Sequence, residues 1–374
     1  TSSVHGSSHV NCPCFISAMV FLRLSRSLRA LSSRTSFAPT LGRRTALGTL
    51  GLGAFAGVGG ALARPASCQA AADGPLESIK AATSDPSLLG KCVAEAVGTA
   101  FIVLGGCGVV CAAKYAGSGM GAFGLAATWG ISVALAVYAT REISGAHLNP
   151  AVTVALVANG MAPLGEAPWY IGAQMVGATL AGFINYFVFA AGIAALEASQ
   201  QVVRGTAAST AIYHGAFGMV PTVALVGPFG AFVCEVWMTA VLAFMIFAFT
   251  DEDNTMPTDA APLAIGATVA TLIATFGPVT GCGMNPARDL GPRLVTLFTG
   301  WGGAALSCWW VYTLGPVLGA VLGGTLYTEF FSAPLKGKAE AKAKAEARAR
   351  AKAFRADLAF AQRPPPKGKA KDAA

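Results

Sequence analysis

Six long apolar stretches, separated by short polar segments, dominate the middle of the chain. They span roughly residues 88–111, 121–140, 168–192, 228–250, 261–279 and 303–328. Each is close to or longer than the ~20 residues that a helix needs to cross the hydrocarbon core of a bilayer. The pattern therefore predicts an all-α membrane protein with six transmembrane helices, and six spans place both termini on the same side.

The composition agrees with this fold class. The chain of 374 residues is 54% hydrophobic and only 12% charged, whereas soluble domains carry about 25% charged residues. No nucleotide-binding loop and no spacing of a catalytic triad is visible. The sequence therefore does not indicate an enzyme, and we expect neither a cofactor nor a nucleic-acid partner.

The net charge of +8 is concentrated in two tails. Up to Lys80 there are 8 Lys and Arg against 2 acids, and from Lys336 onward there are 12 against 4, whereas residues 81–332 have 6 basic and 12 acidic residues. The positive-inside rule places such tails in the cytoplasm or its equivalent. We therefore predict three parts: an N-terminal extension 1–80, a membrane domain 81–332 and a basic tail 333–374.

The N-terminal extension has the composition of a targeting segment. From Met19 up to Asp73 there is no acidic residue, whereas arginine and serine are frequent, as in organellar transit peptides. Arg43 and Arg44 are followed by an apolar run over 45–63, which resembles a thylakoid-type signal. Alternatives are a mitochondrial presequence, an incorrectly assigned gene start, or an additional span over 45–63. We expect a plastid or mitochondrial membrane, with the plasma membrane as the alternative.

The basic tail predicts a helix that packs against nothing. Residues 336–355 are nearly all Ala, Lys, Arg and Glu, which favour a helix but leave it without an apolar stripe. One interpretation is a mobile, solvated tail. The other is an anchor on anionic lipid, in which each cation near the surface contributes about 1 kcal/mol before screening.

An Asn-Pro-Ala tripeptide occurs twice, 136 residues apart, at Asn149-Pro150-Ala151 and Asn285-Pro286-Ala287. Asparagine is a preferred helix cap and proline a preferred first helical residue. Each copy lies between apolar stretches and opens a short helix, predicted over 150–159 and 286–296. Short helices inside a bilayer are tolerated where they line a polar path. The two copies therefore predict two similar halves and a channel between them.

A glutamate occurs inside the first span of each half. Glu95 precedes Asn149 by 54 residues, and Glu235 precedes Asn285 by 50. A carboxylate within a span is costly, so it indicates a specific role. We expect each glutamate to brace the adjacent half-helix segment by accepting backbone hydrogen bonds. A proton relay is the alternative, although no further ionisable residues continue it.

Both motif regions resemble the signatures of one family. Ser144–Thr153 is similar to the first signature of the aquaporin (major intrinsic protein) family, and Gly281–Asp289 to the second. Tyr170–Gln174 and Gly315-Pro316 also fit, and the resemblance covers about residues 88–328. It implies six transmembrane helices plus two re-entrant half-helices in two inverted repeats. It also implies a homotetramer with one pore per subunit.

The chemistry of such a pore follows from the motif. Each asparagine would cap its half-helix with the side-chain oxygen and point its amide NH₂ into the lumen as a donor. Each half-helix N-terminus carries about +0.5 charge. Two such ends near the midplane oppose protons and other cations.

The resemblance implies a constriction formed by Trp129, Ile273, Cys282 and Arg288. Arg288 would be a fixed donor there, the alternative being an arginine that reaches to the interface. Trp129 could instead face lipid, Ile273 could be plain packing, and Cys282 a small filler. A thiol at the constriction would make flux sensitive to mercury. His147 is expected to be structural, with a pH switch as the alternative.

The subfamily markers disagree about the solute. Those of the glycerol-conducting subfamily are Asp289, Arg293 and Trp129. Ile273 replaces the histidine usual in strict water channels, but Cys282 is typical of those channels, and Tyr312 with Thr313 matches neither group. We predict a passive channel for water and small neutral solutes such as glycerol. Alternatives are a strict water channel, a non-conducting membrane-junction protein of the same fold, and a secondary transporter.

The nine cysteines are scattered along the chain. No Cys-x-x-Cys pair occurs, and most lie in or beside apolar spans, where a cysteine behaves as a small apolar residue. The sequence predicts neither a disulfide framework nor a metal site.

Overall fold

A computed structural model describes residues 86–222 and 224–361 of the protein. All elements below belong to the compact unit Asp85–Ala374. The targeting prediction for residues 1–80 lies outside the described residues, as do residues 362–374 of the basic tail.

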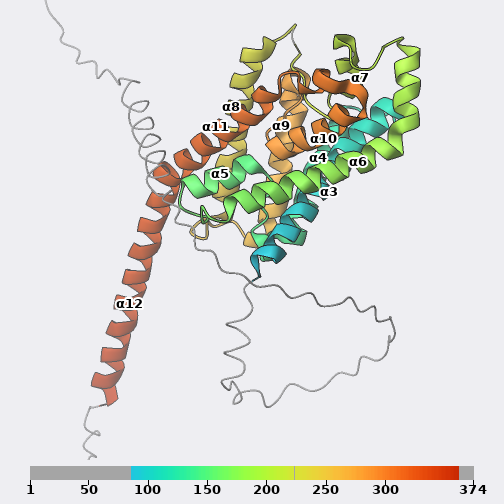
Figure 1. Ribbon diagram of the computed structural model, residues 1–374. Coiled ribbons are helices and arrows are strands. Elements are labelled where there is room, and N and C mark those ends of the chain that lie inside the picture. The colour runs from blue at the N-terminus through green and yellow to red at the C-terminus, as the bar shows by residue number, and fades with distance from the viewer. Residues whose placement is uncertain (1–85, 223, 362–374) are drawn as a thin grey trace, which may run out of the picture. The chain divides into compact units, whose positions relative to one another are not determined.

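The two halves of the membrane domain contain the same series of helices (Figure 1). The first half consists of α3 (Leu88–Tyr115), α4 (Ala122–Ser144), the short α5 (Pro150–Ala158) and α6 (Ala167–Ser199). The second half consists of α8 (Gly227–Thr250), α9 (Ala261–Thr280), the short α10 (Pro286–Thr296) and α11 (Trp309–Tyr327). Among the described helices, six are long and apolar enough to cross a membrane. The predicted fold class is therefore confirmed.

The helix boundaries differ from the apolar stretches at several points. Helices α3, α4 and α6 continue to Tyr115, Ser144 and Ser199, beyond the predicted ends. Helix α11 begins at Trp309 rather than at residue 303. Residues Gly302–Leu306 form instead the 3-10 segment η4, and Cys308 with φ +56° separates it from the helix. Hydropathy does not detect these points, because the irregular segment is itself apolar.

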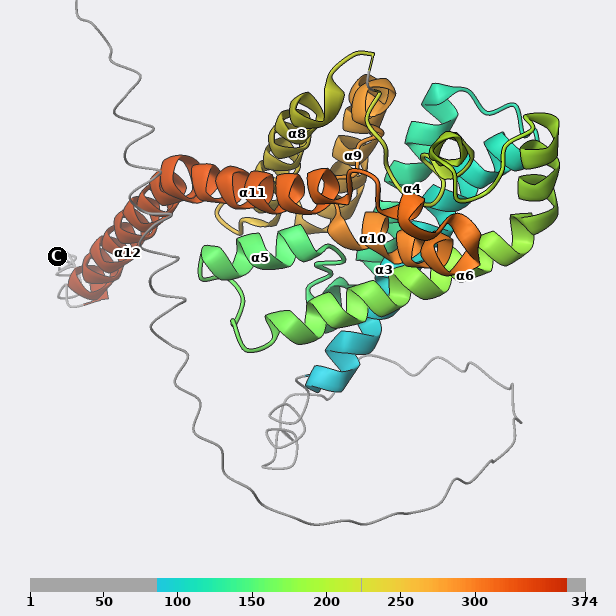
Figure 2. The same ribbon diagram turned by 45° about the horizontal axis from the view of Figure 1, so that its top comes forward.

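The halves are interlocked by their short helices. Within each half, α3 packs against α6 and α8 packs against α11. The half-helices cross over: α5 packs on α11, and α10 packs on α6 (Figure 2). Each half-helix is therefore held by a long helix of the other half.

Helices α4 and α9 cross at the contact between the halves. Gly130 and Gly266 meet there, and a Cβ on either would lie 2.4 Å from the carbonyl oxygen of the other. Small residues at membrane helix crossings allow such backbone contact, which replaces the missing hydrophobic driving force by close packing. This crossing brings the segments that follow α4 and α9 close to each other.

The remaining helical segments lie in the connections and the tail. Between α6 and α8 are η1 (Ala207–Ser209) and α7 (Thr210–Tyr213); η2 (Thr258–Ala260) precedes α9; and η3 (Leu297–Trp301) follows α10. After α11 the chain continues through η5 (Thr328–Ser332) into α12 (Ala333–Ala361), the helix that the tail composition favours.

Large apolar side chains on the outside of the long helices are exposed. Phe123 and Phe187 are 82% and 83% accessible, and Phe229 is 74% accessible. In a chain with six spans, such side chains suit hydrocarbon and not water. A set of buried polar side chains, among them Glu95, Asn149 and Glu235, lies in the interior of this domain.

Candidate functional site

The N-termini of the two half-helices are capped by the two motif asparagines. Asn149 Oδ1 accepts a hydrogen bond from Ala151 N at 2.9 Å. Asn285 Oδ1 accepts from Ala287 N at 3.0 Å and from Arg288 N at 3.2 Å. The proline after each asparagine occupies the first helical position, where no N–H is required. Local capping chemistry therefore fixes where each half-helix begins.

The amide nitrogens of the same asparagines join the two halves. Asn149 Nδ2 donates to the Met284 carbonyl at 2.9 Å, and Asn285 Nδ2 donates to the Leu148 carbonyl at 2.8 Å. The sequence predicts that each amide NH₂ donates into the lumen, and the structure adds a hydrogen bond across the halves. One N–H of each amide is used across the halves, because the two half-helices meet end to end. The second N–H remains as a donor.

Glu95 contacts the backbone of the segment that leads into α5. Its carboxylate accepts hydrogen bonds from His147 N at 2.9 Å and Leu148 N at 2.7 Å. It also accepts from Ser144 Oγ and Gln174 Nε2, both at 2.7 Å. The side chain is completely buried, and four donors compensate its carboxylate for the loss of water.

Glu235 makes the corresponding contacts in the second half. It accepts from Gly283 N at 2.9 Å and Met284 N at 2.8 Å, and from Thr280 Oγ1 at 2.8 Å. It too is completely buried. The two carboxylates therefore have the hydrogen bonds that a bracing role requires.

The braced segments contain unusual backbone conformations. Ala146 and Leu148 have φ +50°, and their counterparts Cys282 and Met284 have φ +55° and +50°. Positive φ is costly for residues with a Cβ and persists where surrounding contacts enforce it. Here the glutamates accept hydrogen bonds from N–H groups of these segments. The carbonyls of the segments therefore remain for partners other than the glutamates.

A cavity of about 700 Å³ runs along the braced segments. Its lining includes the two motif asparagines and all four residues expected at the constriction. At the other end it is lined by the charged residues Arg141, Glu142, Glu252 and Asp259. Most of the remaining lining is aliphatic, including Val133, Leu242 and Val269. The cavity thus has apolar walls with a few polar groups along it.

Arg288 contacts this cavity from the first turn of α10. Its guanidinium carbon lies 4.4 Å from the centre of the Trp129 ring, and Nη2 donates to the Gly215 carbonyl at 3.3 Å. The side chain is only 3% exposed, and Nη1 makes no hydrogen bond within the described residues. A buried guanidinium nitrogen without an acceptor is a donor available to a polar solute.

Comparison with known families agrees with this architecture. The family described as "Major intrinsic protein" matches residues 82–327. The chain belongs to this family. It is therefore an integral, multi-pass membrane protein.

Similar proteins include bacterial facilitators. The chain is 40% identical over 266 residues to the glycerol uptake facilitator protein of Pseudomonas aeruginosa, covering 69% of this chain and 94% of that protein. It is 41% identical over 253 residues to that of Haemophilus influenzae, covering 66% and 95%. It is 38% identical over 256 residues to the propanediol uptake facilitator of Salmonella typhimurium, covering 67% and 96%.

A solved structure shows the same fold. The X-ray structure of the aquaglyceroporin from Plasmodium falciparum matches with a TM-score of 0.58 and 24% sequence identity. The match covers 67% of this chain and 99% of that one. The likeness therefore includes nearly the whole length of that chain and about two thirds of this one.

The other expected constriction residues of this major intrinsic protein differ in how they meet the cavity. Trp129 is 5% exposed and packs in the core, so it does not face lipid. Ile273 is half-buried and lines the cavity. The Cys282 thiol is directed at neighbouring helices, with Sγ 3.3 Å from the Leu272 carbonyl and 3.5 Å from Met238 Sδ. A free thiol projecting into the lumen is therefore not what the structure contains.

His147 is held by contacts on both sides of its ring. Nδ1 lies 3.2 Å from Thr153 Oγ1, and the ring centre lies 4.8 Å from that of Tyr170. These contacts fit the structural role expected for His147. The ring lines the cavity near its Arg141 end.

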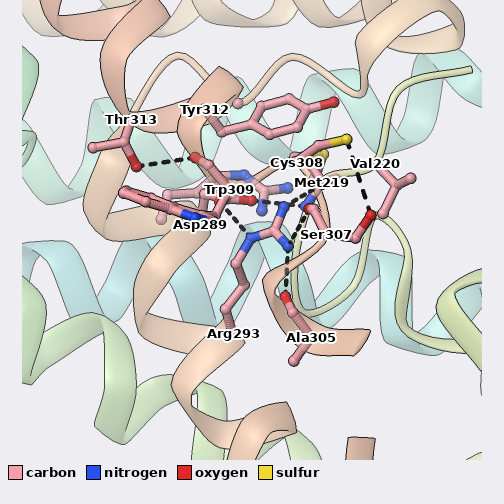
Figure 3. Close-up of polar contacts among 12 residues, drawn as sticks. Met219, Val220, Asp289, Arg293, Ala305, Ser307, Cys308, Trp309, Tyr312 and Thr313 are labelled. Carbon is pink, nitrogen blue, oxygen red and sulfur yellow. Dashed lines mark hydrogen bonds and ion pairs between the residues drawn. The ribbon is translucent and has the colours of Figure 1, made fainter. Parts of the chain in front are cut away.

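The subfamily markers Asp289 and Arg293 form a buried ion pair behind the cavity (Figure 3). Arg293 Nε lies 2.6 Å from Asp289 Oδ2, and both side chains are completely buried. Asp289 Oδ1 accepts from Met219 N at 2.7 Å, and Arg293 Nη2 donates to the Met219 carbonyl. Arg293 Nη1 reaches the carbonyls of Ala305 and Ser307 at 2.7 and 2.9 Å. The pair therefore ties two connecting loops to α10.

The markers Tyr312 and Thr313 also lie away from the cavity lining. The Tyr312 hydroxyl donates to the Thr280 carbonyl at 2.7 Å, and its ring centre lies 5.8 Å from the Arg293 guanidinium. Thr313 Oγ1 donates to the Trp309 carbonyl at 3.1 Å within its own helix. Tyr312 thus supports the braced segment, and Thr313 makes a local contact.

Sequence reasoning missed several residues that position this site. Ser144 and Thr280 each donate to a buried glutamate and accept from a backbone N–H, Ala146 N or Cys282 N, at 3.1 Å. Both stand five residues before a motif asparagine, so aligning the halves could have found them. Gly215 lies in a loop without a repeat, and no sequence signal identifies it.

Proposed function

We propose that this protein is a passive channel for water and small neutral solutes such as glycerol, and that it excludes ions and protons. The observation that carries the proposal is the aliphatic cavity with donors spaced along it. Those donors are Arg288 Nη1 and the second amide N–H of each motif asparagine. A neutral molecule with hydroxyl groups replaces its hydrogen bonds to water by hydrogen bonds to these donors. The aliphatic walls make no hydrogen bonds that would retain it.

The proposed constriction suits a polyol. Trp129 and Ile273 give an apolar wall for the carbon chain, and Arg288 gives a donor opposite the hydroxyl oxygens. The glutamates bind the N–H groups of the braced segments, at His147, Leu148, Gly283 and Met284. The carbonyls of these segments are not used by the glutamates, and we assign them as acceptors for the hydroxyl protons. The names of the facilitators to which the chain is similar support glycerol and propanediol as solute chemistry.

Exclusion of cations follows from the fixed positive groups. The two half-helices meet at their N-termini, each equivalent to about +0.5 charge. Arg288 adds a full charge beside the cavity. A cation would also lose its hydration between aliphatic walls that offer few replacement oxygens. We therefore assign the barrier to the region between the motif asparagines and Arg288.

A strict water channel is the second candidate, and Cys282 favours it. A cysteine at this position resembles the strict water channels, as the sequence comparison of the signatures indicates. Ile273 argues against a strict water channel, because it replaces the histidine usual in those channels and leaves the wall apolar. We therefore favour the mixed-solute channel.

Stopped-flow light scattering on proteoliposomes of the full chain tests both candidates. Water and glycerol gradients are applied to the same vesicles. Flux of both above protein-free vesicles supports the mixed channel, and water flux alone supports the strict water channel. If folded protein gives neither water flux nor glycerol flux, the channel proposal is overturned and a non-conducting junction protein is favoured.

We further propose a homotetramer with one pore in each subunit. The exposed apolar faces of the long helices are available for helix contacts between subunits. Mass measurement in detergent tests this assembly. The curated relatives are bacterial proteins and give no support to a plastid or mitochondrial membrane, so fluorescence localisation of the full chain decides which membrane it occupies.

A further inference from the structure

The Arg288 guanidinium is held from one side by a loop. The Gly215 carbonyl accepts from Nη2 at 3.3 Å, while Trp129 covers the face of the group. Gly215 follows His214, the C-cap of α7, in the connection between α6 and α8. Because this carbonyl helps to set where the other guanidinium nitrogen points, whatever fixes the Gly215 peptide also affects the constriction.

Lys114, in the last turn of α3, fixes the peptide beside Gly215. Its Nζ donates to the carbonyls of Ala211 and His214, both at 2.8 Å. The His214 carbonyl belongs to the peptide group that directly precedes Gly215. On the same peptide, Gly215 N donates to the Gly218 carbonyl at 2.8 Å. Both polar groups of this peptide are therefore bound.

The conformation of Gly215 transmits this restraint to its own carbonyl. Gly215 has φ +79°, a left-handed conformation that a residue with a Cβ rarely adopts. The peptide that contains the Gly215 carbonyl is also bound, because Ala216 N donates to the Tyr213 carbonyl at 3.1 Å. With the peptides on both sides of Gly215 bound, the direction of its carbonyl has little freedom. The restraint at Lys114 thus reaches Arg288 through a single residue.

The other side-chain contacts of the loop act at other residues, and one of them is Tyr115 Oη, which donates to the Ile212 carbonyl at 2.7 Å. Asp289 and Arg293 bind the backbone of Met219, and His214 Nδ1 accepts from Val220 N at 3.1 Å. Among the described side chains that bind this loop, Lys114 is the one that binds the His214 carbonyl, next to Gly215. It comes from the first half of the chain, whereas Arg288 comes from the second.

We propose that Lys114 is a positioning residue of the constriction, which sets the pose of Arg288 through the Gly215 carbonyl and thereby the ratio of glycerol to water permeability. The inference rests on the proposed channel function. A lysine in the last turn of a helix also has a general role, since its charge favours the helix C-terminus. That role stabilises α3 and leaves the permeability ratio unchanged, so the two roles can be separated.

Three variants of the full chain in proteoliposomes test the proposal. Lys114→Met keeps the aliphatic stem but removes the donors. Lys114→Arg keeps a cation with several N–H donors. Lys91→Met is the matched control, because Lys91 lies near the other end of α3 and pairs with Glu166 at 3.2 Å. Glycerol and water permeabilities are measured on the same vesicles, with melting temperature and oligomer size recorded for each variant.

We expect Lys114→Met to change the glycerol-to-water ratio by about threefold to tenfold, the factor that one hydrogen bond contributes to an equilibrium. Lys114→Arg should restore the wild-type ratio, and Lys91→Met should leave it unchanged even if the protein is less stable. An unchanged ratio in folded Lys114→Met would overturn the proposal, as would an equal change in Lys91→Met.

Two further outcomes are covered by the design. If Lys114→Met does not fold, Lys114→Gln is measured instead, since its shorter side chain cannot reach both carbonyls; a wild-type ratio in that variant overturns the proposal, and a changed ratio supports it. If the wild-type protein carries neither solute, the channel proposal fails first, and the positioning role fails with it.

Discussion

The Arg288 guanidinium lies over the indole ring of Trp129, with 4.4 Å between its central carbon and the ring centre. Arg288 lies in the first turn of α10 in the second repeat, and Trp129 lies within α4 of the first. The contact therefore crosses the two halves at the proposed constriction. It joins the donor for a solute hydroxyl to the wall for the solute carbons.

Replacing Trp129 should affect both stability and selectivity. Trp129→Ala removes a buried aromatic side chain, which costs about 3–5 kcal/mol in protein cores. It also removes the cation–π partner of Arg288, a contact of about 0.5–2 kcal/mol. We expect a lower melting temperature and a reduced preference for glycerol over water. Trp169→Ala, at an exposed position at the start of α6, is the control and should leave the permeability ratio unchanged.

Replacing Asn285 should weaken the junction between the halves. Asn285→Ala removes the cap of α10, worth about 1 kcal/mol. It also leaves the buried Leu148 carbonyl without its donor, at a cost of about 1–3 kcal/mol. A loss of water permeability beyond the loss of folded protein is expected. Asn285→Asp keeps the cap but removes the donor, so equal permeability in Asn285→Asp and wild type would contradict the role of the cross-half bond.

Replacing Glu235 should destabilise the braced segment before α10. Glu235→Ala leaves two backbone N–H groups and the Thr280 hydroxyl without their acceptor. Each unsatisfied buried group costs about 1–3 kcal/mol, so we expect little folded protein. Glu340→Gln in the exposed α12 is the control and should fold normally. Normal yield and flux for Glu235→Ala would refute the bracing role.

The mercuric ion should block the channel by reacting with Cys282, whereas bulky thiol reagents should not. Cys282 lines the cavity, whereas its thiol is 2% exposed and lies against Leu272 and Met238. We expect inhibition by Hg²⁺ and little effect of bulky thiol reagents on water flux. Cys282→Ala should remove the Hg²⁺ block, and Cys308→Ala should retain it. Persisting inhibition in Cys282→Ala would place the reactive thiol elsewhere.

Acid should destabilise the loop beside Arg288 through His214. Burial, together with the nearby charges of Lys114, Arg288 and Arg293, lowers the pKa of His214 from 6.5 to about 4. Above pH 6.5 the imidazole is neutral in both folded and unfolded protein. As the pH falls from 6.5 toward 4, the unfolded protein binds a proton that the folded protein does not, so stability decreases. Melting temperatures over this range should fall less in His214→Gln than in wild type.

The elements that depend on local chemistry are readable from the amino-acid sequence. Apolar length fixed six spans, because a helix must satisfy its own backbone in a bilayer. Asparagine followed by proline placed the starts of both half-helices at Asn149 and Asn285, because capping acts within a few residues. The buried glutamates were recognisable as paired features, since a carboxylate within a span has few tolerated environments.

How these elements meet depends on long-range packing, which the three-dimensional structure reveals. The asparagine amides bind carbonyls of the opposite half, and the Cys282 thiol turns toward Leu272. Asp289 and Arg293 hold two loops, and Lys114 reaches from α3 to the peptide beside Gly215 in the connection between the halves. These contacts join segments that are distant in the sequence, and the loops have neither a period nor a repeat. Their partners therefore follow from the packing of the helices and not from any local pattern.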